Sequence, residues 1–412
     1  MPDPIHPIQS LKVSLNLEGN LLEVGRLALR QKHVYFEFDP QILEMGIEIS
    51  PLKLKLREGL LSFDPHLFEG LPGVFYDSLP DGWGRLLLDR SLRSRGLVPE
   101  HLTSLDRLAL VGKCGVGALV YEPEIEQEKS VLNLELDLLF RETSKILNQE
   151  DSDSIDLLLS LNGSSAGARP KIMVKVSQSR DELREPRSTH TDGFEDWMIK
   201  FPNTTDGSDA GAVEYVYSLM AARSGVEMAE THLFPSKNTP GYFGTKRFDT
   251  LHGRRRLHMH SVCGLLHADF RTPALDYEDI IKVTGYLTKS IPQAQEMYRR
   301  AVINVLAHNR DDHGKNFSFL MDFRGEWRLS PAYDLTFSSG PGGEQSTMIK
   351  GEAKNPGEKD LLALAPIADL SEKEAKEIIA ITREALNSWT RLAIDHGVSK
   401  ERISRIQKHI NL

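Results

Sequence analysis

The amino-acid sequence predicts an α+β fold in which a β-rich amino-terminal domain precedes a mixed central domain and a helical carboxy-terminal domain. Residues 11–39 alternate apolar and polar side chains in three short runs, with Gly19-Asn20 as a turn, which predicts an antiparallel meander. Further strand-like runs flank one helical stretch in the central domain, and from about residue 274 the apolar spacing is helical. We place the three domains at 1–125, 131–250 and 251–412.

The composition is that of a globular protein with two or three domains. The chain has 412 residues, of which 40% are hydrophobic and 26% charged. The net charge of −9 argues against a general nucleic-acid binder, which is usually basic. Two cysteines, Cys114 and Cys263, fit a reducing cytosol. No apolar run approaches the ~18 residues of a membrane span, and the first residues lack signal-peptide features, so we expect a cytoplasmic protein without membrane contact.

Two stretches of the amino-terminal domain, 81–92 and 112–117, predict local structures. A helix is predicted over residues 85–92, and Asp81, shortly before it, is a candidate N-cap. Residues 112–117 contain glycines spaced loosely like those of a phosphate loop. Because a strand-like run follows these glycines instead of a helix, we predict a turn there.

The densest group of chemically active side chains is the stretch 308–316, HNRDDHGKN. It lies between an apolar run that predicts a buried helix and an alternating run that predicts a strand, and polar loops on such scaffolds often carry catalytic groups. Asp311 and Asn316 have the spacing of the protein-kinase catalytic loop, in which the Asp accepts the proton of the attacking hydroxyl and the Asn binds Mg²⁺. Asp312 is four residues from Asn316, so we assign the catalytic role to Asp311.

Downstream, Asp334 is a lone carboxylate among apolar residues and can serve as a second Mg²⁺ ligand. Two alternatives stay open for the 308–316 stretch. It can be a polar loop with a capping Asp and surface histidines. It can also be the His/Asp site of a metal-dependent hydrolase, built on His308 and His313, although the sequence contains no second His/Asp cluster.

A loop of small residues, 161–171, precedes a predicted strand in the central domain. Small side chains allow backbone N–H groups to approach a phosphate closely. Ser164 and Ser165 add hydroxyl groups, and Lys171 adds a cation. Most loops of this kind are merely turns, so the composition of the loop is weak support for phosphate binding.

Lys200 lies on the next predicted strand, and Glu214 follows fourteen residues later in a predicted helix. This arrangement matches the Lys–Glu pair of kinases, in which the lysine contacts the α- and β-phosphates; the alternative is a lysine that extends to solvent at a sheet edge. The run 242–249 predicts a strand that can lie under adenine. Residues 253–256 predict a hairpin tip with surface arginines, which can contact a partner or nucleic acid.

The carboxy-terminal domain ends in a predicted long helix. Ser371 and Glu374 have the spacing of a capping box. The apolar pattern then continues over residues 375–396, and Gly397 follows as a stop signal.

Taken together, these motifs occur in the order found in kinases, although G-x-G-x-x-G-x-V, H-R-D and D-F-G are all absent in literal form. The chain resembles the HipA family, the serine/threonine kinases that are toxins of HipA–HipB toxin–antitoxin modules. The resemblance covers essentially the whole chain, including the amino-terminal sheet with its L-P-D-G-W-G motif at residues 79–84. It implies a protein-kinase-like fold with an N-lobe at 131–250 and an all-helical C-lobe. The stretches that carry it are 164–171, 199–202, 214–215, 247–249, 311–318 and 333–334.

Carried over by position, the resemblance assigns a role to individual residues. The catalytic residue is Asp311, the Mg²⁺ ligands are Asn316 and Asp334, and the serine whose phosphorylation shuts down the kinase is Ser164, with Ser165 as the other possible site. The hinge of the family often carries Glu where this chain has Lys246, so an adenine contact through that side chain is in doubt. The residues implied in ATP binding are Ala166, Gly167, Ala168, Arg169, Pro170, Lys171, Lys200, Glu214, Lys246, Arg247, Phe248, His313, Gly314 and Lys315.

The resemblance implies an ATP- and Mg²⁺-dependent kinase that phosphorylates a protein on serine or threonine and also phosphorylates itself. It implies a HipB-type helix-turn-helix antitoxin as partner, through which DNA is contacted indirectly, and an aminoacyl-tRNA synthetase as a possible target. One alternative is a HipA-like co-repressor subunit with weak or no turnover. The metal-dependent phosphohydrolase is the other alternative.

Overall fold

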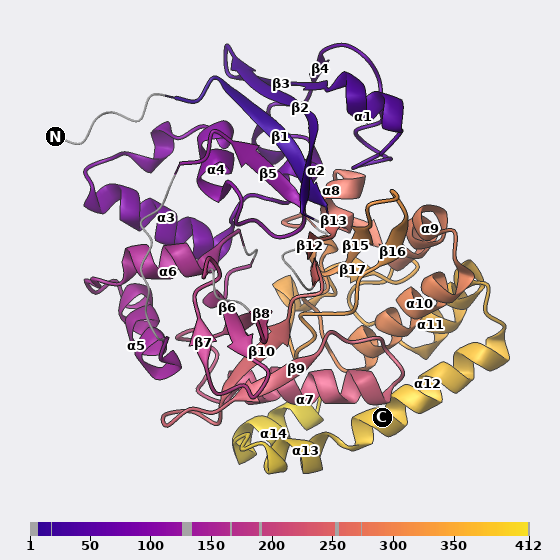
Figure 1. The fold of residues 1–412 in the computed structure, drawn as a ribbon. Helices are drawn as coiled ribbons and strands as arrows, with labels where there is room; N and C mark the ends of the chain where they lie inside the picture. The colour runs from indigo at the N-terminus through magenta and orange to yellow at the C-terminus, as the bar shows by residue number, and fades with distance from the viewer. Residues whose placement is uncertain are drawn as a thin grey trace.

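A computed structural model describes residues 7–17, 19–125, 134–164, 167–188, 192–251, 255–272 and 274–410 of the chain. Two predictions fall wholly or partly outside these residues: the assignments to Ser165 and Ala166, and residues 253–254 of the hairpin tip predicted at 253–256. Figure 1 shows the amino-terminal sheet at the top, α5 and α6 at the left and α9 to α12 at the right. Among the described residues, no helix combines the length and apolar character that crossing a membrane requires.

The amino-terminal part is built on a sheet of order β11-β12-β1-β2-β3-β4, with β5 paired to β1. β1 with β2 and β2 with β3 are antiparallel, which confirms the predicted meander. Alternate side chains of β1, such as Leu11, Val13 and Leu15, are fully buried under this sheet. Its elements are β1 (Ser10–Leu17), β2 (Asn20–Arg30), β3 (His33–Phe38), α1 (Pro40–Met45), β4 (Leu61–Ser62), η1 (Phe68–Gly70), α2 (Gly73–Tyr76), α3 (Gly82–Ser94), η2 (Pro99–His101), α4 (Ser104–Val111) and β5 (Leu119–Glu122).

The central part contains a second sheet, of order β7-β6-β8-β10-β9. Its largest helix, α7, packs one face into the core of the carboxy-terminal region, where Val216 and Met220 are fully buried. The hairpin of β11 and β12 leaves this region and joins the amino-terminal sheet, where β12 runs parallel to β1. The elements are α5 (Leu136–Leu147), α6 (Ile155–Asn162), β6 (Lys171–Ser177), β7 (Leu183–Arg184), β8 (Phe194–Lys200), α7 (Ala210–Arg223), β9 (Thr231–Phe234), β10 (Tyr242–Lys246), β11 (Thr250–Leu251) and β12 (Arg255–Arg256).

The carboxy-terminal part is mainly helical. The implied all-helical C-lobe is wrong, because this part also contains short strands in two small sheets, β13-β15-β16 and β14-β17. The strand β15 follows directly after the stretch 308–316 and pairs with β13 and β16, and helix α10 precedes this stretch. The elements are β13 (His258–Ser261), α8 (Val262–Leu266), β14 (Leu275–Asp276), α9 (Tyr277–Thr288), α10 (Ile291–Leu306), η4 (Gly314–Asn316), β15 (Ser318–Met321), β16 (Trp327–Leu329), η5 (Pro341–Gly343), β17 (Thr347–Met348), α11 (Glu358–Leu364), η6 (Ala365–Ala368), α12 (Glu372–Asn387), α13 (Trp389–Asp395) and α14 (Lys400–Gln407).

The last long helix differs from the prediction. The capping box of Ser371 and Glu374 is present, but the helix predicted over 375–396 is broken at Ser388 into α12 and α13. The Ser388 hydroxyl donates to the carbonyl of Ala385 at 2.6 Å, so a side chain satisfies a helix-terminal carbonyl at this point. Trp389 is fully buried just after the break. An apolar pattern that stays helical through both segments does not predict this break.

Candidate active site

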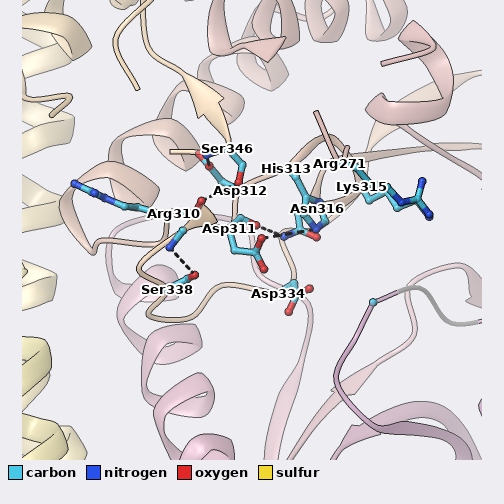
Figure 2. Close-up of polar contacts among 12 residues, drawn as sticks. Arg271, Arg310, Asp311, Asp312, His313, Lys315, Asn316, Asp334, Ser338 and Ser346 are labelled. Atoms are coloured by element: carbon cyan, nitrogen blue, oxygen red, sulfur yellow. Dashed lines mark hydrogen bonds and ion pairs between the residues drawn. The ribbon is translucent and has the colours of Figure 1, made fainter. Parts of the chain in front are cut away.

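A cavity of about 710 Å³ lies where the three parts of the chain meet. The central part contributes the loop before β6, the end of β8 and the segment after β10. The carboxy-terminal part contributes the stretch 308–316 and the segment around Asp334, and the amino-terminal part contributes residues at the start of α3. Figure 2 shows the side chains of Asp311, Asn316 and Asp334 close to one another. Of the residues implied in ATP binding and described here, Pro170, Glu214 and Gly314 do not line the cavity.

Lys200, at the end of β8, is the centre of an ionic group in this cavity. Its Nζ lies 2.6 Å from Glu214 Oε1 on α7 and 2.5 Å from Asp334 Oδ1. This confirms the predicted strand-to-helix ion pair, and because Lys200 is buried it does not extend to solvent at a sheet edge. Burial opposes the charge of Lys200, but Asp334 and Glu214 together raise its pKa above the ordinary value.

Asp334 does not stand alone in apolar surroundings, as its sequence neighbours suggested. Burial would raise the pKa of this carboxyl, but Lys200, Lys171 and Arg169 outweigh that effect and hold the pKa of Asp334 far below its usual range. Its φ of 58° places the backbone in the left-handed region, which is uncommon for a residue other than glycine. The carboxylate is therefore fully ionised and held in a constrained position.

The stretch 308–316 follows α10, whose buried residues confirm the predicted helix. Asn316 donates its side-chain N–H to the carbonyl oxygen of Asp311 at 2.8 Å, so the two ends of the motif are tied together. The Asp311 side chain is exposed to the cavity. Partial burial raises the pKa of Asp311 above its ordinary value. The Asp334 carboxylate raises this pKa further, whereas His313 lowers it. Such a shift suits a group that accepts a proton.

Asp312 has a different environment from its neighbour. It is fully buried, and its carboxylate accepts hydrogen bonds from Tyr277 Oη at 2.7 Å and from the backbone N–H groups of Ser346 and Thr347 at 3.1 and 3.2 Å. Burial raises its pKa to about 6, although these hydrogen bonds oppose the rise. Asp312 therefore anchors the stretch to the rest of the domain, while Asp311 faces the cavity.

The loop before β6 places further cations beside the ionic group. Arg169 lies 3.0 Å from Asp206 and 3.6 Å from Glu214. Lys171 begins β6 directly opposite Lys200 in the strand register, and burial together with the Lys200 charge lowers the pKa of Lys171 to about 8. Three cations around one cavity favour an anionic ligand with several charges, such as a polyphosphate.

Ser164 is almost fully buried at the start of this loop. Its hydroxyl oxygen accepts a hydrogen bond from the backbone N–H of Val116 at 2.9 Å. Val116 belongs to the 112–117 segment, which is a turn before β5, as predicted. The turn at 112–117 thus contacts Ser164, close to the point where helix α6 ends and the loop before β6 begins.

The segment that corresponds to the hinge of the family consists of Lys246, Arg247 and Phe248, and these three side chains have different partners. Lys246 and Arg247 both form side-chain ion pairs, Lys246 with Glu195 at 2.6 Å and Arg247 with Asp249 at 2.6 Å. Their backbone N–H groups are also paired, with the carbonyls of Glu230 and Asp196. The Phe248 ring packs against Tyr333, with centroids 5.5 Å apart. The side chains of this segment therefore shape the cavity wall and hold it to neighbouring strands.

His313 and His308 point in separate directions. The His313 ring packs against Phe270 beside the cavity, at 5.3 Å between centroids. The His308 ring is stacked on Phe337 at 5.5 Å and lies close to His409 near the end of the chain. Within the described ranges, no group of three or more His, Cys, Asp or Glu side chains is arranged to hold a metal ion.

Asn316 and Asp334 nevertheless fit an Mg²⁺ ion that arrives with a nucleotide. Mg²⁺ prefers oxygen ligands, and in nucleotide sites it is bound by one or two carboxylates together with phosphate oxygens and water. Asp334 supplies an ionised carboxylate and Asn316 an amide oxygen, both on the cavity wall. A protein cage of three ligands is not required for such an ion.

Sequence reasoning missed the part that the amino-terminal domain plays in the cavity. Asp81 stands at the N-cap position of α3, as predicted, but its side chain makes no capping hydrogen bond to the helix. Instead Asp81 Oδ2 lies 2.5 Å from Lys315 Nζ, and Oδ1 accepts a hydrogen bond from the backbone N–H of Gly167. Only the tertiary fold brings Lys315 to this carboxylate, because 234 residues separate the two.

The architecture is HipA-like and protein-kinase-like. It combines a β-rich domain, a sheet with a paired Lys and Glu, and a mainly helical region that carries Asp311 and Asp334. Two family models match the chain: the HipA N-terminal domain at residues 15–122 and the HipA-like C-terminal domain at residues 163–390. The chain belongs to the HipA family. No curated protein matches it in sequence.

One solved structure agrees with this assignment at the level of the fold. The HipA, HipB and operator DNA complex of the Shewanella oneidensis MR-1 toxin–antitoxin system matches with a TM-score of 0.70 and 16% identity. The match covers 97% of this chain and 94% of that chain. The Helicobacter pylori proinflammatory kinase CtkA matches with a TM-score of 0.32 and 18% identity, over 52% of this chain and 92% of that chain.

Proposed function

We propose that the protein is a HipA-type toxin kinase that transfers phosphate from ATP, with Mg²⁺, to a serine or threonine of a protein. The observation that carries this proposal is that Lys200 pairs with both Glu214 and Asp334, and that Lys200 and Asp334 line the same cavity as Asp311 and Asn316. A lysine paired to a helix glutamate, a metal-binding Asp and a catalytic-loop Asp are the parts that phosphoryl transfer needs. Membership of the HipA family supports the same activity.

In this proposal each group has a limited task. Arg169, Lys171 and Lys200 bind the phosphates of ATP. Asp311 accepts the proton of the attacking hydroxyl, which its raised pKa favours. Asn316 and Asp334 hold Mg²⁺, which neutralises charge on the phosphates. Catalysis then consists mainly of positioning and charge stabilisation.

The proposed partner is a HipB-type antitoxin. The Shewanella oneidensis HipA is seen with HipB and operator DNA, and this chain shares its fold. The net charge of −9 suits a protein that reaches DNA through a partner instead of directly. An aminoacyl-tRNA synthetase in the cytoplasm is the target that the resemblance to the family suggests.

Substitution of Asp311 tests the proposed activity. We expect Asp311→Asn to reduce phosphoprotein formation from labelled ATP by about 10²- to 10⁴-fold, the usual contribution of a general base. Since the side chain is exposed and makes no structural hydrogen bond comparable to those of Asp312, the variant should keep the wild-type Tm. The matched control is Asp395→Asn, an exposed carboxylate at the end of α13, which should phosphorylate at the wild-type rate.

The same assay separates the alternatives. Wild-type rates in folded Asp311→Asn would refute the assignment of Asp311. Wild-type protein that binds Mg·ATP but forms no phosphoprotein would favour the co-repressor subunit. Release of inorganic phosphate without phosphoprotein would favour the phosphohydrolase.

A further inference from the structure

Asp81 is a buried carboxylate that joins three segments far apart in the sequence. It lies at the start of α3 in the amino-terminal part, with about a tenth of its side chain exposed. One oxygen pairs with Lys315 Nζ at 2.5 Å, in the stretch that carries Asp311 and Asn316. The other accepts the backbone N–H of Gly167, in the loop that begins with Ser164. A single side chain therefore links the catalytic stretch to the small-residue loop across the cavity.

The helix that Asp81 begins does not benefit from this carboxylate. An aspartate at this position usually accepts an N–H of the first turn and so stabilises the helix. At α3 this side-chain bond is absent, and the two oxygens instead accept hydrogen bonds from the Gly167 N–H and from Lys315 Nζ. In α1, by contrast, the N-cap Asp39 accepts the N–H of Gln41 at 2.8 Å. Departures from a local rule of this kind are typical of functional positions.

Lys315 is also enclosed on its other sides. Its Nζ lies 5.0 Å from the centre of the Tyr76 ring and 4.6 Å from that of Phe270. Burial opposes the charge of Lys315, and Asp81 raises its pKa in spite of that burial. Without Asp81, the ammonium would be a buried cation with aromatic rings as neighbours, a state that strongly favours movement of the side chain.

The residues next to Asp81 hold the loop as well. The backbone N–H of Trp83 donates to the carbonyl of Gly167 at 3.2 Å. Gly82 has φ +41°, and a Cβ at Gly82 would lie only 2.6 Å from Ala168 Cα. The backbone of the loop therefore rests directly on Gly82, with no room for a side chain.

We propose that Asp81 is a positioning residue of the kinase site, which fixes Lys315 and the Gly167 amide relative to each other and so makes the amino-terminal domain part of the nucleotide cavity. This inference rests on the proposed function, since it names the reaction that the positioning serves. In this proposal the amino-terminal domain acts on ATP binding through Lys315 and the Gly167 amide, which Asp81 holds in place.

The test uses the full chain with Asp81→Asn, which keeps an acceptor for Gly167 but places an N–H group against Lys315. We expect kcat/KM to fall by roughly 100-fold, as it does when groups at a reacting centre are misplaced. The KM for ATP and the calorimetric Kd for Mg·ATP should both rise. The matched control is Asp39→Asn, also an N-cap in the amino-terminal part, which should change neither value. A merely structural role would lower the amount of folded protein and leave the Kd and KM unchanged.

Two further variants keep the proposal testable. Lys315→Met should raise the Kd for Mg·ATP, and the Asp81→Asn, Lys315→Met double variant should bind no more weakly than the weaker single variant, because both remove one interaction. Gly82→Ala should speed amide hydrogen exchange in residues 167–171 without any change of charge. Tighter binding of Mg·ATP by Asp81→Asn would mean that the Asp81 carboxylate repels the phosphates, and this result would overturn the proposal. An unchanged Kd would overturn it as well.

These measurements separate failure of the inference from failure of the proposed function. A wild-type protein that binds Mg·ATP without forming phosphoprotein would refute the kinase activity, yet its Kd would still report on Asp81. Wild-type phosphorylation together with an unchanged Kd in Asp81→Asn would refute the positioning role alone. A wild-type protein that binds no ATP would refute both.

Discussion

At the scale of the residue, the adjacent carboxylates Asp311 and Asp312 differ in what surrounds them. Spacing to Asn316 favoured Asp311, and the structure exposes Asp311 to the cavity while Asp312 is buried in hydrogen bonds to Tyr277 and residues 346–347. A carboxylate that is fully enclosed cannot reach a substrate hydroxyl. The environment of each side chain, and not its chemical type, therefore separates the proposed base from the anchor.

Asp312 should make stability depend on pH. Its folded pKa of about 6 exceeds the ordinary value of 3.8. Folding favours the protonated form of Asp312, so its contribution to the free energy of unfolding is fully present below about pH 4 and is lost as the pH rises through about 6. The difference in pKa corresponds to roughly 3 kcal/mol, of which about 1 kcal/mol is lost between pH 5 and pH 7. Urea denaturation of wild type and Asp312→Asn at both pH values should show the variant gaining about 1 kcal/mol relative to wild type on going to pH 7. An equal difference at both values would contradict the assigned pKa.

At the scale of the element, much of the fold follows from local patterns. The meander of β1 to β3, the buried helix α10 and the strand β15 are where alternation and apolar spacing predict them, because each element buries one regular face. The break between α12 and α13 at Ser388 was missed, because the apolar pattern stays helical on both sides of it. Of the candidate site, the Lys200–Glu214 pair was predicted from order along the chain, whereas the Asp81–Lys315 pair depends on the packing of separate domains.

The β8 and α7 elements together should control nucleotide affinity. We expect Lys200→Ala to raise the Kd for Mg·ATP by about tenfold or more, since a hydrogen bond to a charged group contributes roughly 1.5–3 kcal/mol. Lys175→Ala is the matched control, because Lys175 lies on the neighbouring strand β6 and pairs with Asp196 at 2.9 Å outside the cavity. Calorimetric titration of both variants measures the effect. Equal affinities in the two variants would refute the role of Lys200.

At the scale of the whole molecule, the three parts of the chain are joined by shared elements. α7 contributes to the core of the carboxy-terminal region, and β12 extends the amino-terminal sheet. The turn at 112–117 and the start of α3 both contact the loop before β6. The small-residue loop is thus held by the amino-terminal domain at both its beginning and its middle.

The position of Ser164 makes this loop sensitive to phosphorylation. Its hydroxyl is buried against the N–H of Val116, and a Cβ at Gly115 would lie only 3.3 Å from it. A phosphate on Ser164 would disrupt the hydrogen bond from the Val116 N–H, and it would add a charge of about −1.5 to −2 on the wall of a cavity that must also accept the charge of ATP. The phosphorylated loop should therefore leave its site and switch the protein off, an order–disorder change of one segment.

Mass spectrometry of protein incubated with Mg·ATP should find phosphate on Ser164, or otherwise on Ser165. The phosphorylated protein should bind ATP more weakly and exchange the amide hydrogens of residues 167–171 faster than the unmodified form. Ser164→Ala should stay active for longer in the presence of ATP, while Ser160→Ala, in helix α6 just before the loop, serves as control. A phosphoprotein that binds ATP as tightly as the unmodified protein would contradict the switch, because displacement of the loop and repulsion of the nucleotide both require a loss of affinity.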